Sequence, residues 1–509
     1  MLVPYGSSNG PMLGWVMELR CLLDCAPAYT RDEKKRPLAG PSKIGTPLRY
    51  SIAALIFVLP AFSANWYVHK GATGSNNGTS WTNAWNEMNQ INFSSVACGD
   101  TVWLGGGTYS SSMTVSKSCT SSTVLTIQSV ISSDSVPTTA AGYTSAVLGQ
   151  VVMNGTITIN AANYITINGR HGTIGTEGTF GIAVECNSNC DAITVGGSGA
   201  ANNVTLTELE LYGPSCVTSG GNGEGSCSGD THGVDHGSSS TTNLVMDHMW
   251  MHRFAEIVRP YQWTNYMIQY CDLDTTRQTP DEHEDLVYAA DPSSGTMRYN
   301  VWWGSPNDGI FFDFGGNSLT FYGNVMFHNG GAMITFKTGY NNGAVVMYNN
   351  TFSSDESFGD YTCPGNCPWI DWTGKPSSIS LENNIFDHVA FSGSASGNYN
   401  AFSSDIGKSD GGANSITYSS AFAGSNLQFV SVNLTNMFAS NFQLTSSGAT
   451  TFQNGATLPS PYNVDLLGDA RGGNGHWYMG AYQYGASGSG GGGTPTPPSP
   501  PTNLTVTVQ

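Results

Sequence analysis

Residues 297–350 read MRYNVWWGSPNDGIFFDFGGNSLTFYGNVMFHNGGAMITFKTGYNNGAVVMYNN. A short apolar segment that ends in Asn occurs in this stretch as MRYN, FYGN and MYNN, and LENN follows at 381–384. Periods of 20 to 50 residues are typical of solenoids, in which each repeat adds one coil to a continuous core. Aligning the four segments places one Asn at the same position of each coil, with spacings of 24, 26 and 34 residues: Asn300, Asn324, Asn350 and Asn384.

An Asn at a turn can hydrogen-bond the neighbouring coil and tolerates left-handed backbone angles. We therefore predict stacked β coils with an Asn ladder at one turn. Three earlier segments, 206–209, 246–249 and 268–271, fit the same strand pattern without the Asn. The alternative is a chance alignment of Asn residues in an Asn-rich chain.

The composition favours one long β structure. Charged residues make up 11% of the 509 residues, far below the roughly 25% of ordinary globular proteins, and there are 63 Gly. A hydrophobic content of 39% is enough for a core, which excludes wholesale disorder. The length allows two or three domains, but one solenoid can absorb most of it. We predict a single all-β domain over residues 65–485.

The N-terminus carries a pattern typical of export. Basic residues precede the apolar run SIAALIFVLPAFSA at 51–64, which has the length of a signal-peptide core and is too short to span a bilayer as a helix. We predict a signal peptide over 43–64, a misassigned start or leader over 1–42, and no stable membrane span after cleavage. The protein is then secreted or held at the cell surface by bacterial-type export. The alternative is a buried core helix.

Cysteine usage agrees with export. Eight of the nine cysteines after residue 63 fall into pairs that are close in sequence, as loop-stapling disulfides do. Cys271 is left over in an apolar pattern and is expected to be a buried thiol. A metal role for the CxxxC spacings is weaker, since no histidine lies near them. The predicted pairs are Cys98/Cys119, Cys186/Cys190, Cys216/Cys227 and Cys363/Cys367.

The charge excludes nucleic acid as a partner. Without residues 1–63 the chain has 11 basic and 32 acidic residues, a formal charge of −21. A polyanionic substrate would therefore need a bound cation or a local basic patch. Five of the 11 basic residues, and six of the ten histidines of the whole chain, lie between 232 and 337. We expect the functional groove in this segment of a monomeric protein.

Residues 65–109 contain NWYV, NGTS, NAW, GDTV and GGGTY in that order. This series resembles the start of secreted right-handed parallel β-helix proteins of the pectate-lyase-like superfamily. The resemblance implies a right-handed parallel β-helix with a short N-terminal helix that caps the first coil, where open strand edges would invite aggregation. Trp81, Trp85 and Met88 have helical spacing, so we expect this helix over 81–91.

The C-terminal part contains DLLGDAR at 465–471 and MGAY at 479–482, which resemble the closing segment of bacterial surface β-helix proteins. Residues 486–501 are rich in Gly, Ser and Pro and are predicted to be a linker. Residues 502–509 form a tail that is too short for a domain.

Equivalent side chains of successive coils stack about 4.8 Å apart, so outward polar residues form a ladder along one face. IFFDFG at 310–315 and ITFKTG at 334–339 align on their final Gly. Phe312 and Phe336 then point inward, and Asp313 and Lys337 point outward as neighbours. Preceding coils add further polar groups, with a register uncertain by one or two residues: His232, Asp235, His236, Glu256, Arg259 and Tyr288.

Such a wall suits proton abstraction beside a uronate carboxylate, which needs a base, a group that neutralises the carboxylate, and an acid for the leaving oxygen. Lys337 lies in FKTGYNNGAVVMYNNTF, which resembles the stretch around the base lysine of β-helix alginate lyases and chondroitinases. The Glu residues of that family just before the lysine are Gly330 and Ala332 here. The candidate catalytic residues are Lys337, Arg259, Asp313, Tyr288, His232 and Asp235.

The remaining candidates concern substrate and cation. Aromatic and basic residues on this stretch are candidates for contacts with an acidic polysaccharide: Arg298, Trp302, Trp303 and His236. The acidic run at 281–285 offers oxygen ligands for Ca²⁺. Its candidate ligands are Asp281, Glu282, Glu284 and Asp285. Zn²⁺ at His232/His236 or His248/His252 is the other metal option, although such pairs share a strand face without any ligand.

We therefore expect a secreted polysaccharide lyase. One alternative is a glycoside hydrolase on the same fold, since Asp308-Gly309-Ile310 resembles one piece of the polygalacturonase pattern. The other is a non-catalytic surface protein that binds glycans. Each signal also has a plain structural explanation: Asp313–Lys337 as a cross-coil salt bridge, 281–285 as a solvated loop, and the tryptophans as packing.

Overall fold

The computed structural model describes residues 63–170, 172–187, 189–214, 231–274, 276, 284–353, 369–419, 428–433 and 437–485. Several predictions from the sequence lie outside these residues. They are the leader and signal peptide, the linker and tail, the pairs Cys216/Cys227 and Cys363/Cys367, and the ligands Asp281 and Glu282.

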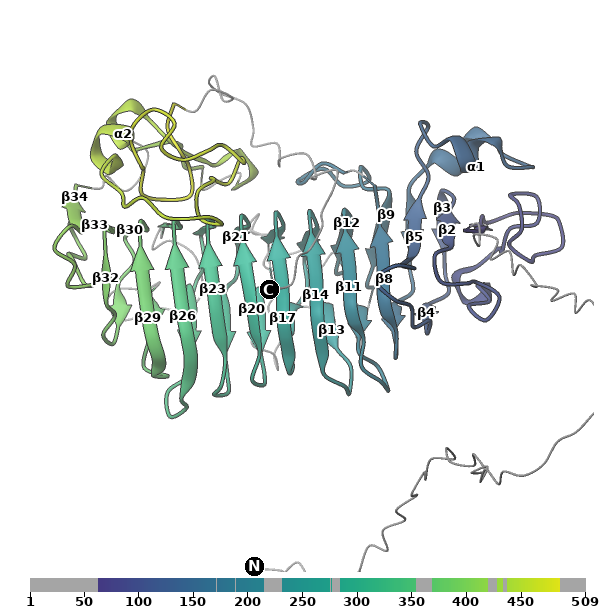
Figure 1. Cartoon of the computed structure of the whole chain (residues 1–509), viewed down its shortest axis with the longest axis horizontal. Coiled ribbons are helices and arrows are strands. Elements are labelled where there is room, and N and C mark those ends of the chain that lie inside the picture. Colours follow the sequence, from purple (N-terminus) through teal and green to yellow (C-terminus); the bar gives the residue numbers. More distant parts are fainter. Residues whose placement is uncertain are drawn as a thin grey trace, which may run out of the picture. The chain divides into compact units, whose positions relative to one another are not determined.

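Three long parallel sheets dominate the described residues, and consecutive strands of the chain go to different sheets (Figure 1). Sheet A contains β1 (Asn65–Val68), β2 (Thr101–Leu104), β5 (Leu125–Ser129), β8 (Asn163–Asn168), β11 (Asn202–Thr207), β14 (Thr241–Asp247), β17 (Trp263–Gln269), β20 (Ser294–Arg298), β23 (Ser318–Tyr322), β26 (Asn342–Tyr348), β29 (Pro376–Glu382) and β32 (Gly397–Asn398).

Sheet B contains β3 (Gly107–Tyr109), β6 (Val151–Met153), β9 (Ile182–Glu185), β12 (Leu209–Tyr212), β15 (Trp250–His252), β18 (Asp272–Asp274), β21 (Val301–Trp303), β24 (Val325–Phe327), β27 (Thr351–Ser353), β30 (Ile385–Asp387), β33 (Ala401–Ser403) and β34 (Ile416–Tyr418). Sheet C contains β4 (Met113–Val115), β7 (Ile157–Ile159), β10 (Cys190–Val195), β13 (Thr231–His236), β16 (Glu256–Val258), β19 (Val287–Ala289), β22 (Ile310–Phe312), β25 (Ile334–Phe336), β28 (Ile370–Asp371) and β31 (Phe391–Ser392).

Each turn of the chain through sheets A, B and C makes one coil, and every pairing within the three sheets is parallel. The fold is therefore the right-handed parallel β-helix that the sequence predicted. Short elements lie outside the coils: α1 (Ser135–Thr139), α2 (Ser446–Phe452), the 3-10 helices η1 (Met88–Gln90), η2 (Ser145–Leu148) and η3 (Met437–Ala439), and the antiparallel pair β35 (Phe429–Ser431) and β36 (Asn441–Leu444).

The predicted Asn ladder runs along the turn between sheets A and B. The backbone N–H and the side-chain amide of Asn300 both donate to Oδ1 of Asn324, at 2.9 and 3.1 Å. The same two bonds link Asn324 to Asn350, Asn350 to Asn384, and Asn384 to Asn400. All five residues are fully buried, so the ladder satisfies the backbone of a turn that water does not reach.

One part of that prediction was wrong. The left-handed backbone belongs to the residue before each Asn, such as Tyr299 (φ 55°), Gly323 (φ 68°) and Asn349 (φ 56°). The three earlier segments align as predicted, since Met246 pairs with Ile268 and Ile268 with Met297. Their left-handed residues occupy the same position without an Asn after them: Glu208, His248 and Tyr270.

The interior of the coils is a stack of apolar side chains. Phe312 pairs with Phe336, and their rings stack at 4.6 Å, which confirms the inward orientation predicted for both. Phe321, Phe352 and Phe386 form a second stack at 5.8 and 5.3 Å. These residues are fully buried, and burial of such large apolar surface is the main stabilisation of a coil that contacts only its neighbours.

The N-terminal cap is present, but it is built from turns. Only Met88–Gln90 is helical in the segment 81–91, as the 3-10 helix η1, so the longer helix that the spacing indicated is wrong. Trp85 and Met88 nevertheless pack into the core cluster of the first coils, and Trp85 forms a β-bridge with Val68. The segment therefore covers the end of the solenoid as expected.

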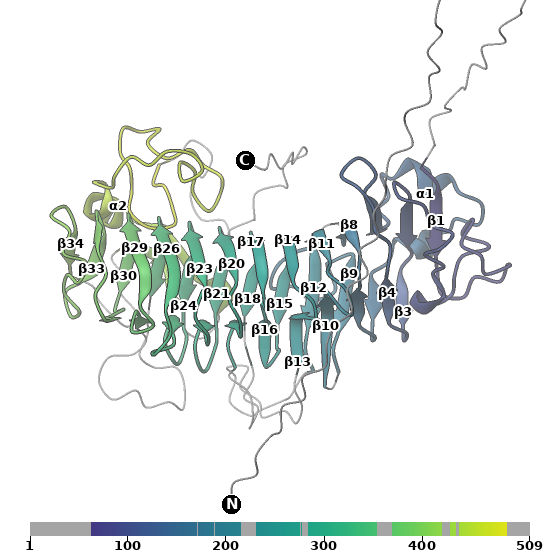
Figure 2. The same cartoon turned by 60° about the horizontal axis from the view of Figure 1, so that its bottom comes forward.

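Residues 428–433 and 437–485 fold back over the outer face of sheet B, where an apolar cluster joins them to β21, β24 and β30 (Figures 1 and 2). The predicted closing segment holds this covering in place. The buried Arg471 guanidinium donates to the carbonyl oxygens of Val464, Tyr478, Gly480 and Ala481 at 2.9 to 3.0 Å. We call residues 428–433 and 437–485 the C-terminal cover.

Two of the predicted disulfides, Cys98–Cys119 and Cys186–Cys190, are formed, and Cys271 is a buried free thiol. Among the described residues no helix has the length and hydropathy needed to cross a bilayer.

Candidate functional site

The polar residues predicted on successive coils meet on the outer face of sheet C. Asp191 on β10 pairs with His232 on β13, and His232 pairs with Glu256 on β16. A second line of residues crosses the coils near the ends of the same strands. Arg259, directly after β16, lies beside Tyr288, because Val258 pairs with Val287, and Tyr288 in turn pairs with Phe311. We call the following set the sheet C row: Asp191, His232, Asp235, Glu256, Arg259, Tyr288, Asp313 and Lys337.

Arg259 is the centre of one half of the row. Its Nε lies 2.8 Å from the Glu256 carboxylate and 3.8 Å from that of Asp235. Its Nη1 lies 2.8 Å from Nε2 of His232. A guanidinium can only donate, so Nε2 of His232 accepts, and the ring proton is on Nδ1, which faces Asp191 Oδ1 at 2.8 Å.

The pKa values in this half respond to the paired charges. Burial would raise the pKa of Asp235, but the hydrogen bond from His236 and the charge of Arg259 outweigh burial and lower it. For His232, burial lowers the pKa, whereas the hydrogen bond to Asp191 and the nearby carboxylates raise it, with a net upward shift. Uptake of a proton at Nε2 would remove the acceptor of Arg259, so this contact belongs to the neutral imidazole.

Tyr288 joins the two halves of the row. The Arg259 guanidinium lies 5.8 Å from the Tyr288 ring centroid, and the Tyr288 hydroxyl donates to Oδ2 of Asp313 at 2.6 Å. Lys337 Nζ donates to the other oxygen, Oδ1, of the same carboxylate. Asp313 is buried, whereas the Lys337 side chain is 43% exposed. The predicted Asp313–Lys337 pair is therefore confirmed as a contact, with one partner open to solvent.

Burial and the Asp313 carboxylate both raise the pKa of Tyr288, so its hydroxyl keeps its proton at all ordinary pH values. A second set of carboxyl groups lies behind the row. Asp285 Oδ1 accepts the backbone N–H of Asp308, and Asp308 Oδ1 accepts that of Ala332, at 3.0 and 2.8 Å. Burial raises the pKa of Asp308 to about 6 and raises that of Asp285 well above its usual value. These two acids brace the turn into sheet C.

The two described residues that were predicted as Ca²⁺ ligands make contacts within the fold. Asp285 is fully buried and serves the turn, and Glu284 has a left-handed backbone (φ 61°), with its carbonyl accepting from Thr276 and Ser305. Among the described residues the group whose ligand atoms lie close enough for a metal, within 4.8 Å of one another, is Asp191, His232 and Asp235. Arg259 already places a positive charge against two members of that group.

The proposed substrate contacts separate into two groups. His236 lies next to the row, with its Nδ1 3.0 Å from the Asp235 carboxylate and its ring stacked on Tyr261 at 4.4 Å. Arg298 is on sheet A, where it donates to Gln269 and Tyr322. Trp302 is fully buried in the core, so its ring has no surface to offer a polymer.

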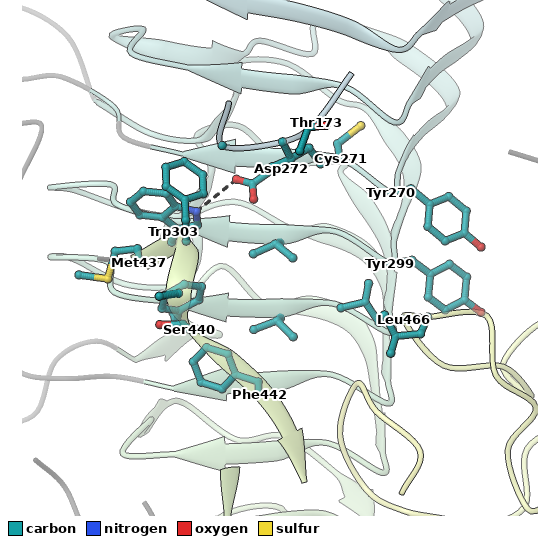
Figure 3. A pocket seen from close by; sticks show the side chains of 18 of the residues that line it. Thr173, Tyr270, Cys271, Asp272, Tyr299, Trp303, Met437, Ser440, Phe442 and Leu466 are labelled. Atoms are coloured by element: carbon teal, nitrogen blue, oxygen red, sulfur yellow. Dashed lines mark hydrogen bonds between the residues drawn. The ribbon is translucent and has the colours of Figure 1, made fainter. Parts of the chain in front are cut away.

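Trp303 lies on a different face, at a pocket between sheet B and the C-terminal cover (Figure 3). The pocket has a volume of about 530 Å³. Its lining is mainly apolar and includes Tyr299, Trp303, Phe438 and Phe442. Arg298, Trp302 and Trp303 are therefore not part of one surface with Lys337, because each lies on a different side of its coil.

The pocket also contains an acid. The Asp272 carboxyl receives a hydrogen bond from Trp303 Nε1 at 3.2 Å and is hydrogen-bonded to Asp274, which receives Trp250 Nε1 at 2.6 Å. Burial, and then the charge of Asp274, raise the pKa of Asp272 well above 3.8. We expect the two neighbouring carboxyl groups to share one proton, because a second charge is disfavoured in a buried site.

Sequence reasoning missed Asp191 and the aromatic residues beside Lys337. Asp191 is recognisable only once β10 and β13 are paired. Phe314 and Tyr340 had a signal, because each stands next to the glycine that aligns the two coils, in FDFG and KTGY.

Comparison with known proteins adds a fold likeness. No family model matches the chain, and no curated protein matches it. Among solved structures, the chain is similar to the pectate lyase Pel9A (12% identity, TM-score 0.47, covering 83% of this chain and 97% of that one). It is also similar to a rhamnogalacturonan lyase (11%, 0.44, 76% and 98%) and to a GH136 lacto-N-biosidase from Eubacterium ramulus (10%, 0.33, 70% and 68%).

Proposed function

We propose that this protein is a carbohydrate-active enzyme that cleaves a uronate-containing polysaccharide by β-elimination on the sheet C row. The observation that carries the proposal is the line of contacts from Arg259 through Tyr288 and Asp313 to Lys337. It crosses four successive coils, β16, β19, β22 and β25. Coils repeat about every 4.8 Å, so a polymer lying along the axis can meet one coil per sugar.

The row offers a base, an acid and a separate anchor for the polymer. Lys337, whose side chain is 43% exposed, is the proton-abstracting group, and Asp313 holds its amine in place. Arg259, held by His232 and Glu256, lies three coils away, so its fixed positive charge binds the carboxylate of another sugar of the same polymer. Tyr288, whose raised pKa keeps it protonated, is the donor for the leaving oxygen.

In the proposed elimination, every bond that breaks is matched by one that forms. The C–H bond next to the carboxylate breaks and its proton goes to the Lys337 amine. The C–O bond to the leaving sugar breaks, that oxygen takes the Tyr288 proton, and a C=C bond forms in the product.

The test is a panel of uronate polysaccharides, followed by the absorbance of unsaturated products. Wild type is compared with Lys337→Ala and with Lys70→Ala, a matched control whose side chain is 46% exposed and paired with Glu87 at the other end of the solenoid. We expect Lys337→Ala to lose at least about 100-fold in rate and Lys70→Ala to lose nothing.

Three results would contradict the proposal in different ways. Full activity of Lys337→Ala would remove the base. New reducing ends without absorbance would indicate hydrolysis, and binding without any product would indicate a glycan-binding protein. Parallel assays with a chelator and with added Ca²⁺ test whether a cation at Asp191, His232 and Asp235 takes part. In the proposal such a cation would add positive charge beside the substrate and have no other role.

A further inference from the structure

Two aromatic side chains stand open beside the Asp313–Lys337 pair. Phe314 is 39% exposed and Tyr340 is 37% exposed, and their ring centroids lie 5.6 Å apart. Among the described residues the other aromatic side chain with comparable exposure is Phe438, which packs edge-on against Trp250 and Trp303. A paired, exposed aromatic surface is costly in water and usually marks a binding site.

The backbone brings the two rings together. Gly316 N–H donates to the carbonyl of Asn341 at 2.8 Å, which ties the turn after β22 to the turn after β25. A Cβ at Gly315 would meet that same carbonyl at 2.7 Å and the Tyr340 Cβ at 3.2 Å. Glycine at 315 therefore permits the close approach of the two turns that carry the rings.

The pair continues the charged row. Lys337 Nζ lies 6.0 Å from the Phe314 ring centroid and 5.9 Å from that of Phe311, and Phe311 stacks on Tyr288 at 5.8 Å. A cation at this distance from the rings is attracted to their faces, which helps to hold the Lys337 amine above them. Apolar ring faces and a cationic group thus meet on one patch.

We propose that Phe314 and Tyr340 form a sugar-stacking subsite, which receives the apolar C–H face of one residue of an acidic polysaccharide while Lys337 faces its carboxylate. That the stacked sugar lies next to a cleavage site rests on the proposed function, whereas the stacking itself rests on the exposed rings. The pair replaces the tryptophans that the sequence suggested as platforms, since Trp302 is in the core and Trp303 lies under the C-terminal cover.

The experiment measures binding separately from cleavage. Dissociation constants for polygalacturonate and alginate oligosaccharides, with neutral dextran as reference, are measured by calorimetry in a Tyr288→Phe background, which slows turnover and keeps Lys337. Phe314→Ala, Tyr340→Ala and the double variant are compared with the aromatic exchanges Phe314→Tyr and Tyr340→Phe. Phe438→Ala is the control, with matched exposure (38%) on another face.

We expect the double alanine variant to bind at least about tenfold more weakly, with the aromatic exchanges and Phe438→Ala within about twofold of the parent. Equal affinity of the double variant and the parent, or no binding by the parent, would overturn the subsite. Cleavage by wild type with unchanged affinity in the variants would sink the subsite and leave the proposed function. Weakened binding in a protein that cleaves nothing would do the reverse.

Discussion

The sheet C row and the sheet B pocket are built from the same kinds of residue and end in opposite electrostatic states. Both have carboxyl groups beside aromatic rings on outward positions of neighbouring coils. On the row, Glu256 faces Arg259 and Asp313 faces Lys337. At the pocket, Asp272 has Asp274 as its neighbour, and burial and the charge of Asp274 raise the pKa of Asp272.

The coil pattern of a solenoid decides the direction of each side chain but not its exposure to solvent. Strand alternation decides which side chains point outward on every sheet. Whether an outward side chain meets solvent depends on what folds over it, and here the apolar C-terminal cover lies on sheet B. The row carries the exposed Lys337 side chain, whereas the Asp272 side chain is buried beside the C-terminal cover. Three predictions test this contrast.

The largest expected effect is on stability at the row. Arg259→Met removes the guanidinium from the fully buried Glu256 carboxylate and should cost about 3–5 kcal/mol. Arg253→Met is the control, because Arg253 pairs with Glu177 at the surface, with side chains 32% and 52% exposed, and should cost at most about 1 kcal/mol. Urea unfolding measures both, and equal costs would contradict the row as a buried charge network.

The next effect is on activity. Tyr288→Phe removes the proton donor and the hydrogen bond to Asp313, and we expect kcat to fall about 10- to 100-fold. Tyr322→Phe is the matched control, since the Tyr322 hydroxyl accepts from Arg298 on sheet A, away from the row. Steady-state kinetics on the polysaccharide found active in the panel decides. A loss in Tyr322→Phe as large as in Tyr288→Phe would show that the effect is not local to sheet C.

The smallest effect belongs to the pocket and depends on pH. The pKa of Asp272 is raised in the folded state, so its contribution to stability is fully present below about pH 4 and is lost as pH rises through the folded pKa. The slope is at most about 1.4 kcal/mol per pH unit. Asp272→Asn should flatten the plot of unfolding free energy against pH, because its amide can donate to Asp274 without titrating. Parallel profiles for wild type and variant would refute the shared proton.

Several features of the site were predictable from neighbouring residues alone. The aligned glycines of two coils were enough to place Asp313 beside Lys337 and Phe312 on Phe336, because two short strands of equal length admit one register. The same face of the solenoid could be assigned to Tyr288, Arg259 and His232. Their contacts could not be predicted, because the loops between those coils differ in length and leave the register of the coils open. Trp302 and Trp303 were misjudged because both lie in β21, where strand alternation points Trp302 into the core and Trp303 toward the C-terminal cover.

By itself the sequence determined the class of fold, through the repeated Asn and the alternation of apolar residues, both of which are local patterns that every coil must repeat. It also determined where charge is concentrated. Only the tertiary structure decided which acids are paired with cations, which have a raised pKa, and which aromatic rings remain open. Part of this depends on contacts between coils, such as His232 with Asp191, 41 residues apart, and Lys337 with Asp313, 24 residues apart, and part on what the C-terminal cover lies upon. The physical reason is that burial and pairing, rather than residue type, decide the state of an ionisable group.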